Sequence, residues 1–362
     1  MFYFARVLKG KQMRKYHGNK LVLLFLCFMM PFGFAACKPK FSAMEPVSQS
    51  KFLLGTDCQI TIYDPVDTKV FDKAFDRIAE IEREMTVNNA DTSEIIRLNQ
   101  AAGKQEVKIS ADTFSVLEKG LYYSQLSEGR FDVTVGPLVK LWNINTSEAA
   151  IPSESDLQKA LPLIDYKKLH LNKETSTAKL DAEGMMVDLG GVAKGFTADE
   201  VGKVLRQNGV QHAIINLGGN VLTLGSKPSG EDWKVGVQHP QEHRGTYVGI
   251  VKVKNKTAVT SGIYERFFEK DGKIYHHILD KKTGYPVENN LFSATVITTL
   301  SSNGDGLSNT LFQMGIDRGM ELQKQLTDIE VIFVTKDKKI YVSQGLKDSF
   351  ELTDDSFQVF YK

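Results

Sequence analysis

The sequence contains too few cysteines for a disulfide framework. Only 3 cysteines occur among 362 residues, at positions 27, 37 and 58. The first lies inside an apolar N-terminal run and the second closes that run, so Cys58 is the one thiol expected in the interior of the folded domain. We therefore expect the fold to be stabilised by its hydrophobic core and not by disulfide bonds.

The sequence also lacks an excess of charge of either sign. Lys and Arg number 45 and Asp and Glu number 44, which gives a formal net charge of +1. A protein that binds nucleic acid normally has a strongly basic face or tail. The balance argues against a nucleic-acid partner and favours a small molecule or another protein.

One apolar run is present, at the N-terminus. Basic residues from Arg6 to Lys20 precede the uncharged stretch Leu21–Phe34, which is too short for a comfortable membrane span. Residues 1–36 are therefore predicted to be a secretory signal, with Met13 as an alternative start. The run ends in Ala-Ala-Cys37 and resembles a bacterial lipoprotein cleavage site, at which the cysteine is lipidated; an ordinary signal that leaves Cys37 as a thiol is the alternative.

Lipidation of Cys37 would anchor the exported protein at the periplasmic face of the inner membrane. Residues 37–50 are then expected to form a polar, flexible tether, and residues 51–362 the folded domain. This domain has roughly three hundred residues, enough for a large core.

Hydrophobic periodicity predicts long helices mixed with largely antiparallel strands. Apolar residues at helical spacing predict helices over 70–86, 113–126, 154–160, 306–314 and 319–326. Short apolar or alternating runs predict strands over 53–63, 185–187, 212–216, 221–224, 233–238, 247–253, 274–279, 293–298, 331–334 and 340–342. Residues 152–182 are mostly polar and linker-like, apart from the short helix, and no internal repeat is present. The pattern predicts an α+β fold.

The segment 187–199 joins an apolar run to an amphipathic helix through two glycines. Glycines at such a corner let the backbone approach a ligand, and the first turn of a helix offers unpaired N–H groups and a positive dipole end. Together with Lys194 this arrangement suits a phosphate or pyrophosphate, and Asp188 could bind a hydroxyl, an amine or a metal. The spacing matches neither the P-loop nor the dinucleotide-binding fingerprint. Taken alone, a structural turn with a solvated lysine is the simpler interpretation.

Two further segments concentrate residues that suit chemistry. His276 and His277 are adjacent on a predicted strand and face opposite ways, so at most one of them can share a site with ligands on a given face. Asp305 stands at a predicted helix start with further oxygen-bearing side chains one turn on, which suits magnesium better than zinc. A helix N-cap is the alternative role for Asp305.

Taken in order, these segments resemble the motifs of the ApbE family of flavin transferases. The matching segments are 131–138 with Leu141-Trp142, 188–195, 216–220, 260–266, 277–286 and 305–308. The resemblance runs from about Phe52 to the C-terminus and implies an ApbE-type, T-fold-like α+β domain. It also implies an enzyme that takes FAD, splits the pyrophosphate with Mg²⁺, transfers FMN to a threonine or serine of an acceptor protein and releases AMP. With water as the acceptor, the same chemistry would be FAD pyrophosphatase activity.

The resemblance assigns roles to individual residues. It implies contacts with FAD by Asn88, Thr134, Val135, Gly136, Asp188, Lys194, Glu265, Arg266, His277, Ile278 and Leu279. It implies metal binding by Asp305, Gly191 and Asn309. His277 is the candidate general base, while Lys194 and the metal held by Asp305 would neutralise charge on the phosphates. Asp280 either orients a neighbouring group or serves only its own turn.

Two positions depart from the family pattern. Asn88 stands where an aromatic residue commonly covers the flavin, and Asn309 stands where a threonine is usual.

The expected acceptor is a membrane flavoprotein such as a redox-pump subunit. The alternative function is a non-catalytic, lipid-anchored protein that binds and delivers flavin, and magnesium-dependent release of AMP from FAD would distinguish the two.

Overall fold

We describe a computed structural model of the chain, which describes residues 45–88, 92–144 and 146–362. The signal peptide, the lipidation site Cys37 and most of the predicted tether lie outside these residues and stay predictions. Residues Ala43–Lys362 form one compact unit. In the described ranges, no helix has the length and apolar character needed to cross a membrane.

The unit is built on a nine-stranded sheet in which every neighbouring pair is antiparallel except the last, β15 with β17. Across the sheet the strands are β1 (Val47–Leu53), β2 (Thr56–Ile62), β6 (Ala213–Leu217), β7 (Asn220–Leu224), β10 (Thr257–Gly262), β13 (Leu291–Thr298), β14 (Glu330–Thr335), β15 (Lys339–Val342) and β17 (Gln358–Tyr361). In β2 the alternate residues Cys58, Ile60 and Ile62 are buried, as their period-two pattern predicts.

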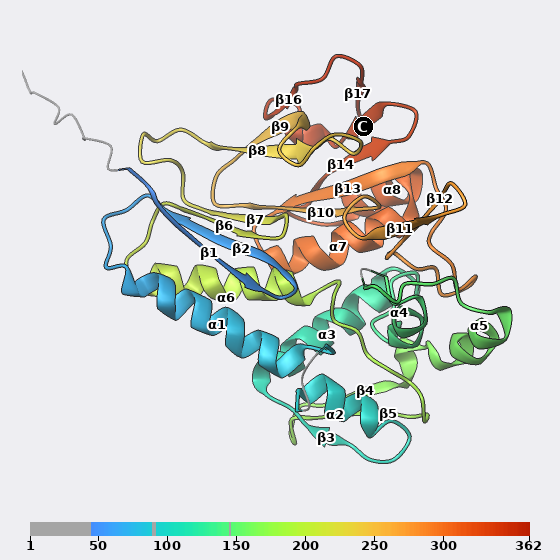
Figure 1. Ribbon diagram of the computed structural model, residues 1–362. Coiled ribbons are helices and arrows are strands. Elements are labelled where there is room, and N and C mark those ends of the chain that lie inside the picture. Colours follow the sequence, from blue (N-terminus) through green and yellow to red (C-terminus); the bar gives the residue numbers. More distant parts are fainter. Residues whose placement is uncertain (1–44, 89–91, 145) are drawn as a thin grey trace, which may run out of the picture. The chain divides into compact units, whose positions relative to one another are not determined.

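Different layers cover the two faces of this sheet. Helices α1 (Lys69–Met85), α6 (Ala193–Gln207) and α7 (Ser301–Met314) lie along one face (Figure 1). The other face packs against a three-stranded sheet of β8 (Trp233–Gln238), β9 (Tyr247–Val253) and β16 (Phe350–Leu352). The functional motifs of α6 and α7 therefore belong to the helical layer.

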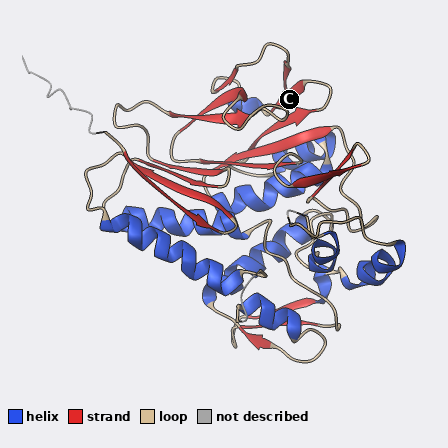
Figure 2. Ribbon diagram, viewed as in Figure 1, coloured by secondary structure: helices blue, strands red, loops and turns tan. Residues whose placement is uncertain are grey.

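Most of the remaining elements lie on the side of the helical layer away from the nine-stranded sheet (Figure 2). The remaining elements are α2 (Glu94–Gln100), α3 (Ala111–Leu126), α4 (Gly136–Trp142), α5 (Glu154–Ala160), α8 (Ile316–Gln325), a small sheet of β3 (Val107–Lys108), β5 (Thr177–Leu180) and β4 (Leu169–Asn172), and a hairpin of β11 (Phe267–Lys270) and β12 (Lys273–His276). The predicted α+β class with largely antiparallel sheets is confirmed.

Several predicted boundaries were wrong for identifiable reasons. The short helix predicted over 154–160 is confirmed as α5, but the rest of 152–182 is not a linker, because residues 169–172 and 177–180 pair as the strands β4 and β5. The run 185–187 forms only an isolated bridge from Met186 to Val135. The predicted strand 274–279 ends at His276, because the chain then turns back on itself. The predicted tether overlaps β1, which starts at Val47.

The start of α7 was also placed too late, at Gly306. The helix begins at Ser301, and Asp305 lies in its second turn, so Asp305 is not an N-cap. Glycine is a poor helix former, which is why Gly304 and Gly306 looked like a boundary. Both are required inside the helix, because a Cβ at Gly304 would lie 2.7 Å from Val259 and one at Gly306 would lie 2.1 Å from Tyr123.

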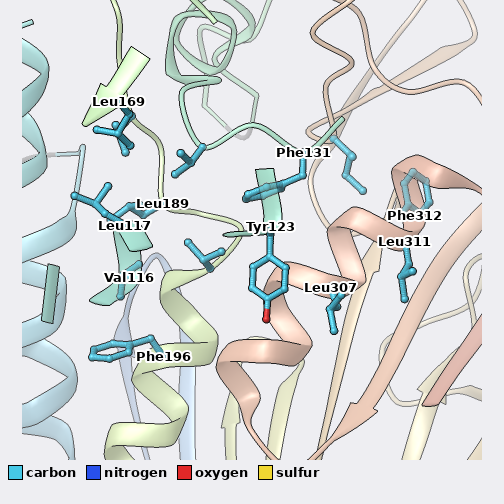
Figure 3. Close-up of a cluster of buried hydrophobic side chains, with 14 of the residues drawn as sticks. Val116, Leu117, Tyr123, Phe131, Leu169, Leu189, Phe196, Leu307, Leu311 and Phe312 are labelled. Carbon is cyan, nitrogen blue, oxygen red and sulfur yellow. The ribbon is translucent and has the colours of Figure 1, made fainter. Parts of the chain in front are cut away.

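The largest core cluster lies between the helices and connects the motif-bearing segments. Figure 3 shows part of this cluster, which includes Phe131, Tyr123 and Leu189 together with Phe196 of α6 and Leu307 of α7. Leu189 stands next to the predicted site residue Asp188, and Phe131 lies three residues before the predicted Thr134. Packing of these apolar neighbours fixes the backbone from which the polar side chains project.

Candidate functional site

The centre of the candidate site is the contact between the first turn of α6 and the second turn of α7. The two backbones come very close at Gly195, where a Cβ would lie 2.3 Å from the Ser301 carbonyl oxygen and 2.7 Å from the Asp305 Cβ. A residue with a side chain could not be accommodated there without moving α7. Gly195 therefore sets how near Asp305 comes to Lys194.

The Asp305 carboxylate is held by α6. Its Oδ2 accepts a hydrogen bond of 2.9 Å from the Gly195 N–H, and its Oδ1 lies 3.9 Å from Lys194 Nζ. The residue is only 4 % exposed, whereas the Lys194 side chain is 24 % exposed. A buried carboxylate with one N–H donor and one distant ammonium is well placed to interact with a further cation.

Gly191 and Asn309 face each other across the same junction. A Cβ at Gly191 would lie 3.4 Å from Asn309 Nδ2, and Gln313 donates a hydrogen bond of 2.8 Å to Asn309 Oδ1. Asn309 follows Asp305 by four residues and so shares its helix face. The structure thus places Gly191 beside Asn309, which shares a helix face with Asp305, and the metal-binding role of the three residues stays a prediction.

Asp188 lies beside the glycine corner at residues 190 and 191. Its carboxylate accepts a hydrogen bond of 2.8 Å from the Gly190 N–H. Desolvation raises the pKa of Asp188, while the Gly190 N–H and the positive charge of Arg266 partly offset this rise. Part of the residue surface is still accessible.

The segment Thr134–Gly136 is joined to Asp188 through the backbone. The Asp188 N–H donates to the Val133 carbonyl at 3.0 Å, and the Gly136 N–H donates to the Met186 carbonyl at 3.1 Å. Thr134 is fully buried and its hydroxyl donates to Asp132 at 2.7 Å. Thr134 is thus committed to Asp132, and Val135 and Gly136 line up beside Met186.

His277 directly follows β12 and lies against the backbone of Arg266. Its backbone N–H and its ring Nδ1 both lie 3.1 Å from the Arg266 carbonyl oxygen. A carbonyl only accepts, so Nδ1 carries the proton of the neutral ring and Nε2 keeps its lone pair. Desolvation and the charge of Arg266 lower the pKa of His277 to about 3, and Lys194 adds a smaller effect of the same sign.

His276 and Asp280 have structural roles. The Nε2 of His276 donates to the Val287 carbonyl at 3.1 Å, and its Nδ1 accepts from the Ile278 N–H at 3.3 Å. The Asp280 carboxylate accepts from the Lys282 N–H at 2.8 Å, within its own turn. His277 is therefore oriented by the Arg266 carbonyl and not by Asp280, and only His277 has a ring nitrogen left for chemistry.

The remaining predicted flavin contacts are Asn88, Glu265, Arg266, Ile278 and Leu279. Arg266 lies close enough to lower the pKa values of both Asp188 and His277, and Glu265 forms an ion pair of 3.2 Å with Arg244. Ile278 and Leu279 are buried, and Ile278 uses its N–H and carbonyl within the protein. Asn88 lies on an exposed turn closed by its N–H on Thr86, next to residues outside the described ranges. The structure does not bring Asn88 into contact with the residues above, so its role stays a prediction.

The donors present suit a hard cation. Within the described residues, no group of three or more His, Cys, Asp or Glu side chains could hold a metal ion. Magnesium commonly uses one or two carboxylates and takes its remaining ligands from water and substrate phosphates. The buried Asp305 carboxylate fits that requirement, whereas the Asn309 amide oxygen accepts from Gln313 and would have to leave that hydrogen bond to bind a cation.

Sequence reasoning missed two groups that build the site. Asp199 of α6 accepts hydrogen bonds from the Ser301 and Ser302 N–H groups at 2.8 and 2.9 Å, and so caps α7 from a neighbouring helix. Asp132 accepts four hydrogen bonds beneath the Thr134 segment. Asp132 was visible in the matching segment 131–138, whereas an inter-helix cap leaves no local sequence signal.

Comparisons with known proteins agree with this arrangement. Residues 54–333 match the sequence profile of the ApbE family. The chain is 37 % identical over 312 residues to an FAD:protein FMN transferase of Klebsiella pneumoniae, covering 86 % of this chain and 96 % of that protein. It is 31 % identical over 341 residues to an FAD:protein FMN transferase of Treponema pallidum, covering 90 % and 94 %. The structure of the flavin transferase ApbE from Vibrio cholerae superposes with a TM-score of 0.75 at 28 % identity, covering 84 % of this chain and 99 % of that one.

Proposed function

The chain belongs to the ApbE family, and from this premise we propose that it is a magnesium-dependent FAD:protein FMN transferase. The reaction would join the FMN phosphate to a threonine or serine hydroxyl of an acceptor protein and release AMP. One observation supports this proposal most: the buried carboxylate of Asp305 meets Lys194 and the Gly195 N–H at a helix start, with neutral His277 nearby. A protein that only stored flavin would have no need of that combination.

Binding of the pyrophosphate is proposed for the α6 side of the site. The N–H groups in the first turn of α6 and the ammonium of Lys194 supply positive potential. The guanidinium of Arg266 adds a second positive charge near Asp188. These groups would hold the two phosphates of FAD and draw negative charge away from the phosphorus that is attacked.

His277 is proposed as the general base. Its neutral ring carries the proton on Nδ1, so Nε2 can accept the proton of the attacking hydroxyl. The hydroxyl oxygen forms a bond to the FMN phosphorus, the bond from that phosphorus to the bridging oxygen breaks, and AMP leaves. Water in place of the hydroxyl would give FMN and AMP, the proposed pyrophosphatase activity.

Asp305, Asn309 and the Gly191 backbone would hold the cation. When bound, Mg²⁺ supplies positive charge to the pyrophosphate oxygens and favours departure of the AMP phosphate. Asp305 also keeps its hydrogen bond to Gly195, so the carboxylate is already oriented before the cation arrives.

We further propose export and lipidation at Cys37, which would place the catalytic domain at the periplasmic face of the inner membrane. Basic residues before an apolar run and the Ala-Ala-Cys sequence support this. The acceptor would then be a membrane flavoprotein with a domain on the same side.

The test is release of AMP from FAD by a chain starting at Ala43, with and without Mg²⁺ and with a chelator. Membrane fractions added to the reaction should gain flavin that stays on protein after denaturation. Asp305→Asn is the matched variant, since an amide oxygen can still accept from Gly195 while the negative charge is lost. Loss of AMP release in that variant, with unchanged folding, is expected. FAD binding by the unaltered protein, with neither AMP release nor protein-bound flavin when acceptor membranes are present, would instead identify a flavin carrier.

A further inference from the structure

Asp132 is a buried carboxylate that the proposed chemistry does not use. Its side chain is 1 % exposed. Oδ1 accepts hydrogen bonds from the N–H and hydroxyl of Thr134, at 2.9 and 2.7 Å. Oδ2 accepts from the Tyr166 N–H at 3.2 Å and from Lys281 Nζ at 2.7 Å. The carboxylate is saturated by donors, and its one ionic partner is distant in sequence.

The chain makes room for that partner. Gly129 has a positive φ of 75°, and a Cβ there would lie only 2.7 Å from Lys281 Nζ. The same ammonium lies 5.6 Å from the centre of the Tyr166 ring, where a cation interacts favourably with the aromatic face. The Lys281 ammonium therefore fits between Gly129, in the loop after α3, and the ring of Tyr166.

Lys281 belongs to the turn that follows His277. The turn is closed by a hydrogen bond of 2.9 Å from the Val287 N–H to the Ile278 carbonyl and by a bridge between Leu279 and Pro286. At its far end, Trp142 Nε1 donates to the Gly284 carbonyl at 2.7 Å. Lys281 and the Trp142 contact are thus two attachments of one turn to the segment 129–142.

The Asp132 side of the pair is connected to the flavin-binding side of the site. Thr134 is held by Asp132, and the neighbouring backbone is hydrogen-bonded to Met186 and Asp188. His277 directly precedes the turn that carries Lys281. A continuous set of short contacts therefore joins Asp188 to His277 through one ion pair, in which Asp132 is buried and Lys281 is partly exposed.

We propose that Lys281 and Asp132 are a positioning pair, which sets the distance between the base His277 and the segment Thr134–Gly136, the segment that would face FAD in the proposed function. The inference rests on the proposed function for the role of His277. Neither residue touches the reacting atoms. The pair acts by holding two segments, which belong to different parts of the sequence, in one arrangement.

A pair that only added stability would change folding but not the balance of kinetic constants. A positioning pair should act mainly on the chemical step, since small displacements of a base are costly for proton transfer. We expect Lys281→Met to lower kcat for AMP release by about 10- to 100-fold, with the FAD dissociation constant changed by less than about threefold. Lys281→Arg keeps the charge and should restore most of kcat.

Lys282→Met is the matched control. Lys282 is the adjacent residue, its side chain is exposed, and its contribution to the turn is made by its backbone N–H. This variant loses the same charge one position away and should keep the kinetic constants of the parent protein. The double variant Asp132→Asn with Lys281→Met should lose no more than the worse single variant, since both remove one interaction.

Hydrogen exchange gives a readout that does not depend on activity. In Lys281→Met the amides of residues 278–287 should exchange faster, while those of β13 keep their protection. Equal behaviour of the Lys281→Met and Lys282→Met variants in kcat and in exchange would overturn the inference. A parent protein that releases no AMP would refute the proposed function, and the exchange result would still decide whether the pair holds the turn.

Discussion

At the scale of single residues, two adjacent histidines have different roles: His277 is the proposed general base, and His276 holds the turn together. His277 has one free ring nitrogen and partial exposure, while His276 is buried with both nitrogens in hydrogen bonds. His277→Ala should slow AMP release by roughly 10²–10⁴-fold with FAD binding retained. His276→Ala should instead destabilise the fold by about 1–3 kcal/mol, because the Val287 carbonyl and the Ile278 N–H lose their partner.

Steady-state rates, FAD titration and urea unfolding on both variants would test this assignment. Large loss of turnover in a stable His276→Ala protein, with His277→Ala fully active, would reverse the roles.

The pKa of His277 leads to a second residue-scale prediction. Burial and Arg266 hold this pKa at about 3, so the ring is already neutral at pH 5. The rate of AMP release should therefore show no inflection near pH 6.5, the value of an unperturbed histidine. A pH–rate profile from 5 to 8 checks this, and a drop of about tenfold per unit below pH 6.5 would contradict it.

The lowered pKa of His276 predicts how the folding stability changes with pH. His276, whose pKa is lowered to about 4 by burial, is neutral in the folded chain and protonated in the unfolded chain between pH 4 and 6.5. The unfolded state binds the extra proton, so folding stability should fall as pH falls below 6.5, by up to about 1.4 kcal/mol per unit for this residue. Unfolding free energies of the parent and of His276→Gln should differ in slope over this window and run parallel above it.

At the scale of elements, the approach of α6 and α7 depends on Gly195. Gly195→Ala places a methyl group against the Ser301 carbonyl and the Asp305 Cβ, so α7 must shift. We expect a loss of about 1–3 kcal/mol in stability and a loss of AMP release well beyond what that destabilisation explains. Gly209→Ala is the control, because a Cβ there meets nothing within 4 Å, although its φ of +84° adds local strain. Full activity in Gly195→Ala would show that the Lys194–Asp305 spacing is not critical.

Helices and strands were predictable from the sequence where apolar residues recur at one uninterrupted spacing. α5 and the strands β8 and β9 match their predicted ranges, since alternation or helical spacing is uninterrupted there. α7 failed because its glycines serve contacts with Val259 and Tyr123 from other parts of the chain. The site residues were found by their motifs, but the Asp132–Lys281 pair and the Asp199 cap depend on packing between distant segments, and no local pattern encodes such contacts.

At the scale of the whole molecule, all described site residues belong to the compact unit Ala43–Lys362. The first strand of this unit, β1, lies at the edge of the large sheet and pairs with β2 over all seven of its residues. Most β1 side chains are exposed, so β1 stabilises the sheet mainly through its backbone pairing with β2 and through the Leu53 carbonyl, which accepts from the buried Cys58 thiol. Removal of residues before Ala43 should thus leave the fold unchanged, whereas removal of β1 should not.

Two truncated chains test this. A chain starting at Ala43 should keep the unfolding temperature of the longer protein, and its rate of AMP release should be unchanged. A chain starting at Gly55 exposes the β2 edge to solvent and to other chains, which favours self-association. We expect its unfolding temperature to fall by about 5 °C or more, and light scattering should show aggregation before unfolding is complete. Equal melting and equal solubility of the two chains would mean that the nine-stranded sheet does not need β1, and that the folded domain begins after residue 53, near the predicted boundary at residue 51.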